Sequence, residues 1–124
     1  MNNVLFIALG GAGGALARYG LHLLVHGTDP VRFPWATLAV NAAGSFFIGA
    51  AYVLIVERAW LHPDWRGVLM VGFLGAFTTF STFSLESLLL FEAGRIGAGL
   101  VYTGASLLLC LLSVWAGMYL LRLL

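Results

Sequence analysis

The chain has 124 residues, of which 61% are hydrophobic and only 9% are charged. A soluble domain of this length cannot bury so much apolar surface, so the composition excludes a soluble protein and indicates one integral membrane domain over residues 1–124. The formal net charge is +1, and the sequence holds no basic cluster that would bind nucleic acid. Cys110 is the single cysteine, so we expect no intramolecular disulfide and a small buried hydrophobic side chain there.

Four apolar segments are expected to cross the lipid bilayer as helices, at about residues 4–25, 35–56, 67–91 and 97–121. Each reaches or exceeds the roughly 20 residues that span the hydrocarbon core. The connectors are short and polar, and all the prolines lie in them, at Pro30, Pro34 and Pro63. The expected fold class is therefore an all-α integral membrane protein with four transmembrane helices.

The orientation of these helices is weakly specified by charge. Both ends of a four-span chain lie on one side of the membrane, together with Arg58, Arg66 and Arg122, while Arg32 and Arg95 lie on the other. Such a small bias under the positive-inside rule leaves two outcomes open. The chain inserts in one orientation, or it inserts in both and allows an antiparallel dimer. A dimer would also give more interior to polar intramembrane groups, which normally face protein or water.

The first expected span carries a charge and a glycine motif. Arg18 lies roughly 5 Å from the centre of the span along the helix axis. An arginine at that depth costs about 2.5–3.5 kcal/mol on insertion scales, so it either has a partner or an aqueous role, or it extends towards the nearer interface. Gly10 and Gly14 form a GxxxG pair suited to close helix packing.

The second expected span presents a polar face. Thr37, Asn41 and Ser45 recur every four residues, so they lie on one side of a helix. The carboxamide of Asn41 offers two N–H donors and a carbonyl acceptor inside the bilayer. Asn41 can therefore belong to a polar pathway, or it can simply bond to a neighbouring helix.

The third expected span contains the stretch GFLGAFTTFSTFS, residues 72–84, near its midpoint. Hydroxyl side chains offer the backbone competing hydrogen bonds and glycine lowers helix propensity, so we expect a local break in this helix. A break would free backbone carbonyls that protein, water or an ion must satisfy. Phe80 and Phe83 share a face, where the positive edges of their rings would favour an anion or where they would only pack.

Three further polar positions lie later in the chain. Glu86 is roughly 10 Å from the centre of the third span and can pair with Arg18, join a polar network or carry a proton. Thr103 and Ser106 are three residues apart and can face the same pathway. The histidines show no metal-ligand spacing and no Ser–His pair lies at membrane depth, so we do not expect an enzyme.

Three signatures in this sequence are similar to those of a known family: GGAGGALARYG in the first span, PWATLAVNAAGSFFIG entering the second, and GFLGAFTTFSTFS in the third. Over nearly its whole length the chain resembles the bacterial fluoride channels called Fluc (CrcB). The third signature is highly specific by its order and density. The resemblance implies passive fluoride efflux across the bacterial inner membrane through an antiparallel, dual-topology homodimer with two pores.

The same resemblance implies roles for particular residues. The third helix would break at mid-membrane, where carbonyls of Gly75 and Thr78 from both subunits would hold a structural sodium ion. Phe80 and Phe83 would line the pores, and Asn41 matches the pore asparagine. The remaining candidates for the fluoride pathway are the first-helix arginine and a polar track: Arg18, Thr79, Ser81, Thr82 and Ser106.

Two other protein classes stay open. A small proton-coupled multidrug or guanidinium exporter also has four spans, but its chemistry requires an essential carboxylate in the first span, where this chain has none, so Glu86 would have to serve. A structural subunit without transport activity would explain the glycines but not Asn41 together with the hydroxyl-rich centre of the third span.

Overall fold

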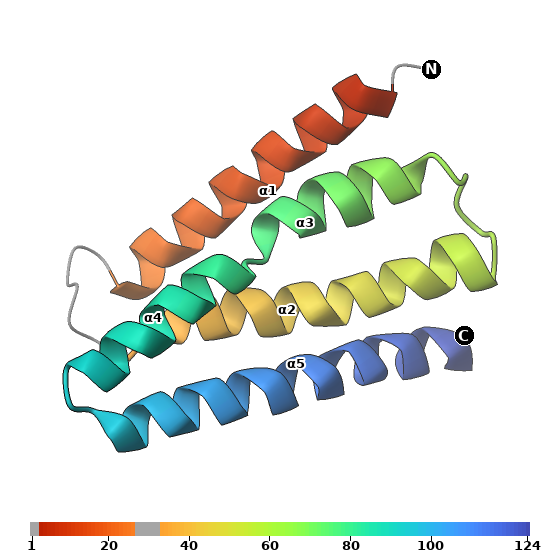
Figure 1. The fold of residues 1–124 in the computed structure, drawn as a ribbon. Helices are drawn as coiled ribbons and strands as arrows, with labels where there is room; N and C mark the ends of the chain where they lie inside the picture. The colour runs from red at the N-terminus through yellow and green to blue at the C-terminus, as the bar shows by residue number, and fades with distance from the viewer. Residues whose placement is uncertain (1–2, 27–32) are drawn as a thin grey trace.

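The computed structural model describes residues 3–26 and 33–124. Within these ranges the regular structure is entirely helical (Figure 1). Four helical segments are long and apolar enough to cross a membrane: Asn3–His26, Trp35–Glu57, Arg66–Glu92 and Ile96–Leu123. The predicted all-α architecture with four long apolar helices is therefore confirmed. Arg32, which was assigned to the first connector, lies outside the described residues.

Two of the four segments are composite. The first span is a single helix, α1 (Asn3–His26), and the last span is also a single helix, α5 (Ile96–Leu123). The second consists of α2 (Trp35–Tyr52) followed by the π-helical turns of η1 (Val53–Glu57). The third consists of η2 (Arg66–Leu74), also π-helical, then α3 (Gly75–Phe77) and α4 (Phe80–Glu92). Hydropathy does not predict the π-helical turns, because i→i+5 hydrogen bonding leaves the apolar character of a span unchanged.

The central helix of the subunit is α2, which buries more residues than any other helix. Helix α5 packs along α2, and α1 packs along η2. The approach of α1 depends on its glycines. A Cβ atom on Gly10 would lie 2.5 Å from the carbonyl oxygen of Val68, and one on Gly14 would overlap the carbonyl of Phe73. The GxxxG pair therefore forms the contact between α1 and the third span.

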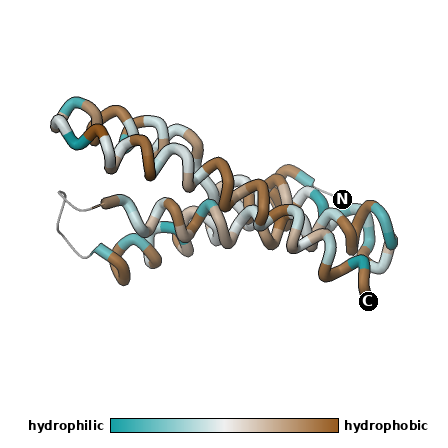
Figure 2. Tube along the Cα trace, turned by 90° about the horizontal axis from the view of Figure 1, so that it is seen from below, coloured by the Kyte–Doolittle hydropathy of each residue, from teal (hydrophilic) through white to brown (hydrophobic). Residues whose placement is uncertain are grey.

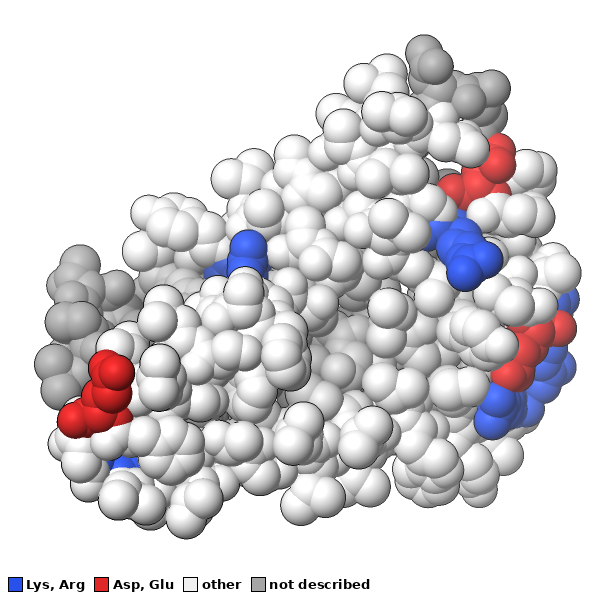
Figure 3. All heavy atoms as spheres, viewed as in Figure 1, with Lys and Arg blue, Asp and Glu red and all other residues white. Residues whose placement is uncertain are grey.

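Charged groups mark the two ends of the bundle. Helix α1 begins and helix α5 ends at the same end of the molecule, close to the connector between η1 and η2 (Figure 1). Figure 3 shows most acidic and basic side chains towards the two ends, with a broad uncharged region between them. At the end that holds the termini, Arg122 Nε donates to Glu57 Oε2 at 2.9 Å, and Arg58 donates to the Arg122 carbonyl at 2.7 Å. These bonds join the end of α5 to the end of η1.

The outer surface of the subunit is apolar. Hydrophobic segments run along all four spans, and most hydrophilic segments lie nearer their ends (Figure 2). Helices that are apolar on every side are typical of membrane spans rather than of amphipathic surface helices. Two small cores fill the interior: one around Phe83 and Tyr102, and another around Ile55 and Leu74. These two cores lie on opposite sides of the interruption between α3 and α4, and the candidate site lies at that interruption.

Candidate functional site

The third span leaves its helical course at two threonines. Helix α3 ends at Phe77, and Thr78 and Thr79 have extended backbone, with ψ angles of 159° and 119°. Figure 1 shows the resulting step between α3 and α4. The hydroxyl oxygen of Thr79 accepts the N–H of Thr82 at 3.2 Å, which caps the first turn of α4. The Thr79 hydroxyl, one of the groups that disfavour a continuous helix, therefore also caps the start of α4.

Asn41 of α2 holds the interruption through two hydrogen bonds. Its Nδ2 donates to the carbonyl oxygen of Thr79 at 3.0 Å, and its Oδ1 accepts the N–H of Thr79 at 2.8 Å. Both backbone groups of Thr79 are thereby satisfied outside any helix. One N–H of the carboxamide takes no part in this pair. Asn41 therefore bonds to the neighbouring segment and also keeps a donor for another partner.

The same bonds free two carbonyl groups. In a continuous α-helix the N–H of Thr79 would donate to the carbonyl of Gly75, and that of Thr82 would donate to the carbonyl of Thr78. Here the first N–H donates to Asn41 and the second to the Thr79 hydroxyl. Gly75 and Thr78 are thus two of the positions where the interruption diverts the helical donor of a backbone oxygen.

A cavity of about 380 Å³ lies beside the interruption. Its walls come from α2, from the extended threonines, from α4 and from α5. Most of the lining is apolar, with a few polar groups that converge on one space, as in many ligand sites. Among the residues that line it are Asn41, Ser45, Thr79, Phe80, Phe83 and Ser106.

The two phenylalanines of this cavity have different surroundings. Their ring centroids are 5.5 Å apart and the rings are tilted by 50°. Phe83 is 7% exposed and packs against Tyr102, whereas Phe80 is 75% exposed. The spacing of three residues does place both rings on one face. One ring is fixed in the core, and the other projects beyond the subunit.

Ser106 of α5 supplies an unpaired hydroxyl group. Its side chain is 5% exposed, and its Oγ has no hydrogen-bond partner among the described residues. Leaving a buried polar group unpaired costs about 1–3 kcal/mol, so such a group favours a partner from outside the subunit. Thr103 differs, because its hydroxyl donates to the Gly99 carbonyl of its own helix at 2.8 Å. Of these two positions, Ser106 is the one that lines the cavity.

Three of the residues selected for the fluoride pathway do not line this cavity: Arg18, Ser81 and Thr82; neither does Gly75, which was selected for the sodium ion. Arg18 lies half-exposed on α1. Ser81 is exposed, with its Oγ 3.3 Å from the hydroxyl oxygen of Thr79, and Thr82 accepts a hydrogen bond from that hydroxyl at 3.1 Å. The hydroxyl groups of Thr79, Ser81 and Thr82 thus form a local network at the start of α4.

A second polar cluster surrounds Glu86. Its Oε1 accepts the hydroxyl of Thr37 at 2.9 Å, and its Oε2 accepts the hydroxyl of Tyr102 at 2.7 Å. Thr37 Oγ1 also lies 3.3 Å from Nε2 of His22. Of the three uses considered for Glu86, the structure shows the polar network. The sequence analysis missed Tyr102, although a tyrosine hydroxyl inside an apolar span usually needs a polar partner.

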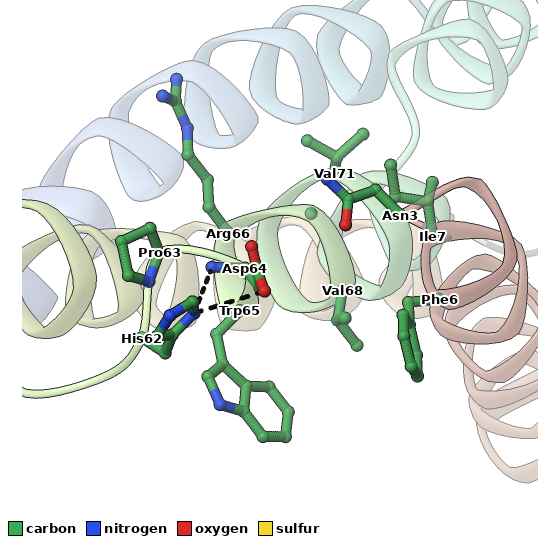
Figure 4. Close-up of a pocket in the computed structure, with 11 residues that line it drawn as sticks. Asn3, Phe6, Ile7, His62, Pro63, Asp64, Trp65, Arg66, Val68 and Val71 are labelled. Atoms are coloured by element: carbon green, nitrogen blue, oxygen red, sulfur yellow. Dashed lines mark hydrogen bonds and ion pairs between the residues drawn. The ribbon is translucent and has the colours of Figure 1, made fainter. Parts of the chain in front are cut away.

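A larger cavity, of about 760 Å³, lies between the first turns of α1, the connector that precedes η2 and η2 itself (Figure 4). Phe6 of α1 and Val68 of η2 form part of its walls. His62 Nδ1 lies 3.3 Å from a carboxylate oxygen of Asp64 at its edge. None of the residues selected from the sequence lines this cavity, so the smaller one is the candidate site.

The chain is similar to several named bacterial proteins. Residues 5–118 match the family described as CrcB-like protein, Camphor Resistance (CrcB). A protein of Hahella chejuensis named fluoride-specific ion channel FluC is 48% identical, over 98% of this chain and 95% of that protein. Proteins of the same name from Saccharophagus degradans and Acidobacterium capsulatum are 52% and 45% identical, over 89% and 92% of this chain and 82% and 91% of their own lengths.

Proposed function

The chain belongs to the CrcB-like protein family, and from that premise we propose that it is a fluoride-specific ion channel that lowers cytoplasmic fluoride by passive efflux. It is a multi-pass membrane protein and not an enzyme. The observation that carries the proposal is the cavity beside Thr79, where Asn41, Ser106 and the two phenylalanines meet. We assign the protein to the inner membrane of a bacterium.

The groups around the cavity suit a small anion. Fluoride is strongly hydrated, so its entry into a narrow path requires donors that replace water. Asn41 has one N–H that its two hydrogen bonds with Thr79 do not use, and Ser106 has a hydroxyl without a partner among the described residues. The edges of aromatic rings carry partial positive charge and can face the anion between these donors. The movement is passive, because the ion follows its own electrochemical gradient.

The assembly we propose is an antiparallel dual-topology homodimer with two pores. The support is the exposure of Phe80, which projects beyond the cavity of its own subunit at 75% exposure. A second copy would cover this ring and close the open side of the cavity, since intramembrane polar groups normally face protein or water. With one cavity of this kind in each subunit, the dimer would have two pores.

We also assign a structural sodium ion to the dimer interface. A hard cation takes oxygen ligands, and the carbonyls of Gly75 and Thr78 are among those that lose their helical donors at the interruption. Two carbonyls from each subunit would hold the ion. When bound, it supplies a fixed positive charge and joins the interrupted helices of the two subunits.

A pair of charge variants tests the dual topology. The side of the membrane that holds the chain ends carries three arginines, and the other side carries two. His62→Arg changes these counts to four and two. Arg66→Ser combined with Ala93→Arg changes them to two and three. All three positions are exposed. Each variant expressed alone should be biased towards one orientation and lose fluoride release severalfold, whereas co-expression should restore it. Full release from both variants alone, with labelling that shows one orientation in each, would exclude the antiparallel assembly.

The main alternative is a proton-coupled multidrug or guanidinium exporter that uses Glu86. Liposomes loaded with potassium fluoride, with valinomycin setting the membrane potential, separate the two. We expect fluoride release to follow the potential and to be the same with and without a pH gradient, in the wild type and in Glu86→Gln. No fluoride release, together with release of guanidinium from loaded liposomes that requires an inward proton gradient and is lost in Glu86→Gln, would favour the exporter, because proton coupling needs a titratable group.

A further inference from the structure

Cys110 does not have the surroundings that the sequence analysis expected. Instead of being a buried core residue, it is partly exposed and lines the cavity beside the interruption. It follows Ser106 by four residues on α5, which places the two side chains one above the other on the same helix face, about 6 Å apart along the axis. The chain contains no other cysteine. Chemistry at a thiol in this protein is therefore confined to one position.

An independent feature indicates that this part of the cavity receives a ligand. The Ser106 side chain is nine-tenths buried or more, lines the cavity and has an Oγ without a hydrogen-bond partner in the described part of the chain. A buried hydroxyl of this kind calls for an ion or a water molecule. A thiol one turn away lies next to the same position, so anything bound to its sulfur would compete for that space.

We propose that Cys110 is a binding site for a soft, thiophilic metal ion, Hg(II) being the representative, and that occupation of this site blocks the fluoride path. This inference rests on the proposed function of the cavity. Mercuric chloride is uncharged, so it can enter an apolar space without the cost of burying a charge. The thiol S–H bond breaks, an S–Hg bond forms, and one chloride leaves with the released proton. No oxidant or reductant takes part. Soft thiolate ligands favour soft metal ions over hard ones, so Mg²⁺ should have no such effect.

The position of the thiol, beside the unpaired Ser106 hydroxyl, favours a block rather than a silent modification. The volume of the cavity is about 380 Å³. At a share of roughly 30 Å³ for each water molecule, this corresponds to space for on the order of ten waters. A chloromercury group on Cys110 would occupy the part next to the Ser106 hydroxyl. Fluoride would then have to pass a large apolar substituent at the position where the Ser106 hydroxyl had been available as a donor.

The test uses the full-length protein in fluoride-loaded liposomes, with mercuric chloride as the probe. Release by the untreated wild type is measured first, and its absence would count against the proposed function rather than against the metal site. Mercuric chloride should then slow the release at least tenfold, and 2-mercaptoethanol should restore it. Cys110→Ser, compared with its own untreated rate, should be insensitive. Intact mass should show one mercury adduct on the wild type.

A matched control moves the thiol to another face of the same helix. Leu112 is 58% exposed and does not line the cavity, so Cys110→Ser combined with Leu112→Cys should gain the mercury adduct without losing fluoride release. An adduct on Cys110 with undiminished release would overturn the proposal. So would the lack of any adduct on the wild type, or equal inhibition of Cys110→Ser or of the Leu112 control.

Discussion

Asn41→Asp is expected to reduce fluoride release by a factor of about a hundred or more, which corresponds to roughly 2.7 kcal/mol in the barrier. An aspartate still accepts the N–H of Thr79, but it cannot donate to the Thr79 carbonyl as Nδ2 does now. An unsatisfied buried polar group costs about 1–3 kcal/mol. The carboxylate also places a negative charge at the cavity, which repels an anion. The measurement is the initial rate of release recorded with a fluoride electrode.

Thr103→Val is the matched control for this substitution. The Thr103 hydroxyl bonds to the Gly99 carbonyl in its own helix and does not line the cavity, so release should stay within a factor of two. Size-exclusion chromatography of both variants establishes that they remain assembled. If assembled Asn41→Asp released fluoride at the wild-type rate, Asn41 would have no role in conduction.

Phe80→Ile should remove selective fluoride release almost completely while the subunit keeps its fold. Isoleucine is apolar and similar in bulk, but it has no ring edge to face an anion. Phe80 is 75% exposed within the subunit, so this change removes little core packing. Phe83→Ile should also stop release, but because Phe83 lies in the core with Tyr102 it should additionally destabilise the subunit, by roughly 1–3 kcal/mol. Phe80 is therefore the cleaner position for the experiment.

The same substitution at another exposed phenylalanine controls for a general effect on membrane helices. Phe47 of α2 is 56% exposed, packs edge-on against Phe46 and does not line the cavity. Phe47→Ile should keep wild-type release. Equal losses in Phe47→Ile and Phe80→Ile would show that the ring at position 80 has no special part in the pathway.

Much of the helical architecture is predictable from this sequence, for simple physical reasons. Twenty apolar residues cross a bilayer only as a helix, and the prolines mark where helices cannot continue. The extended residues Thr78 and Thr79 lie inside the stretch where hydroxyl groups are densest. Local competition for backbone hydrogen bonds is encoded in neighbouring residues, so a single sequence carries that signal.

The contacts of the site are less predictable, because they join residues far apart in the chain. The sequence places Asn41 on a polar face, but not against Thr79, which is 38 residues away. It does not pair Tyr102 with Glu86, and it assigns Cys110 to the core rather than to the cavity. In a soluble helix the apolar stripe fixes which side faces inward. These spans are apolar all round, so the rotation of each helix depends on packing that hydropathy does not encode.

The most direct test of a selective fluoride channel is release from liposomes that contain the purified protein, fluoride and chloride, with valinomycin setting the potential. External electrodes for the two anions record both fluxes at once. We expect rapid loss of fluoride with chloride retained. No fluoride release from correctly assembled protein, with and without sodium, or equal release of both anions, would contradict the account.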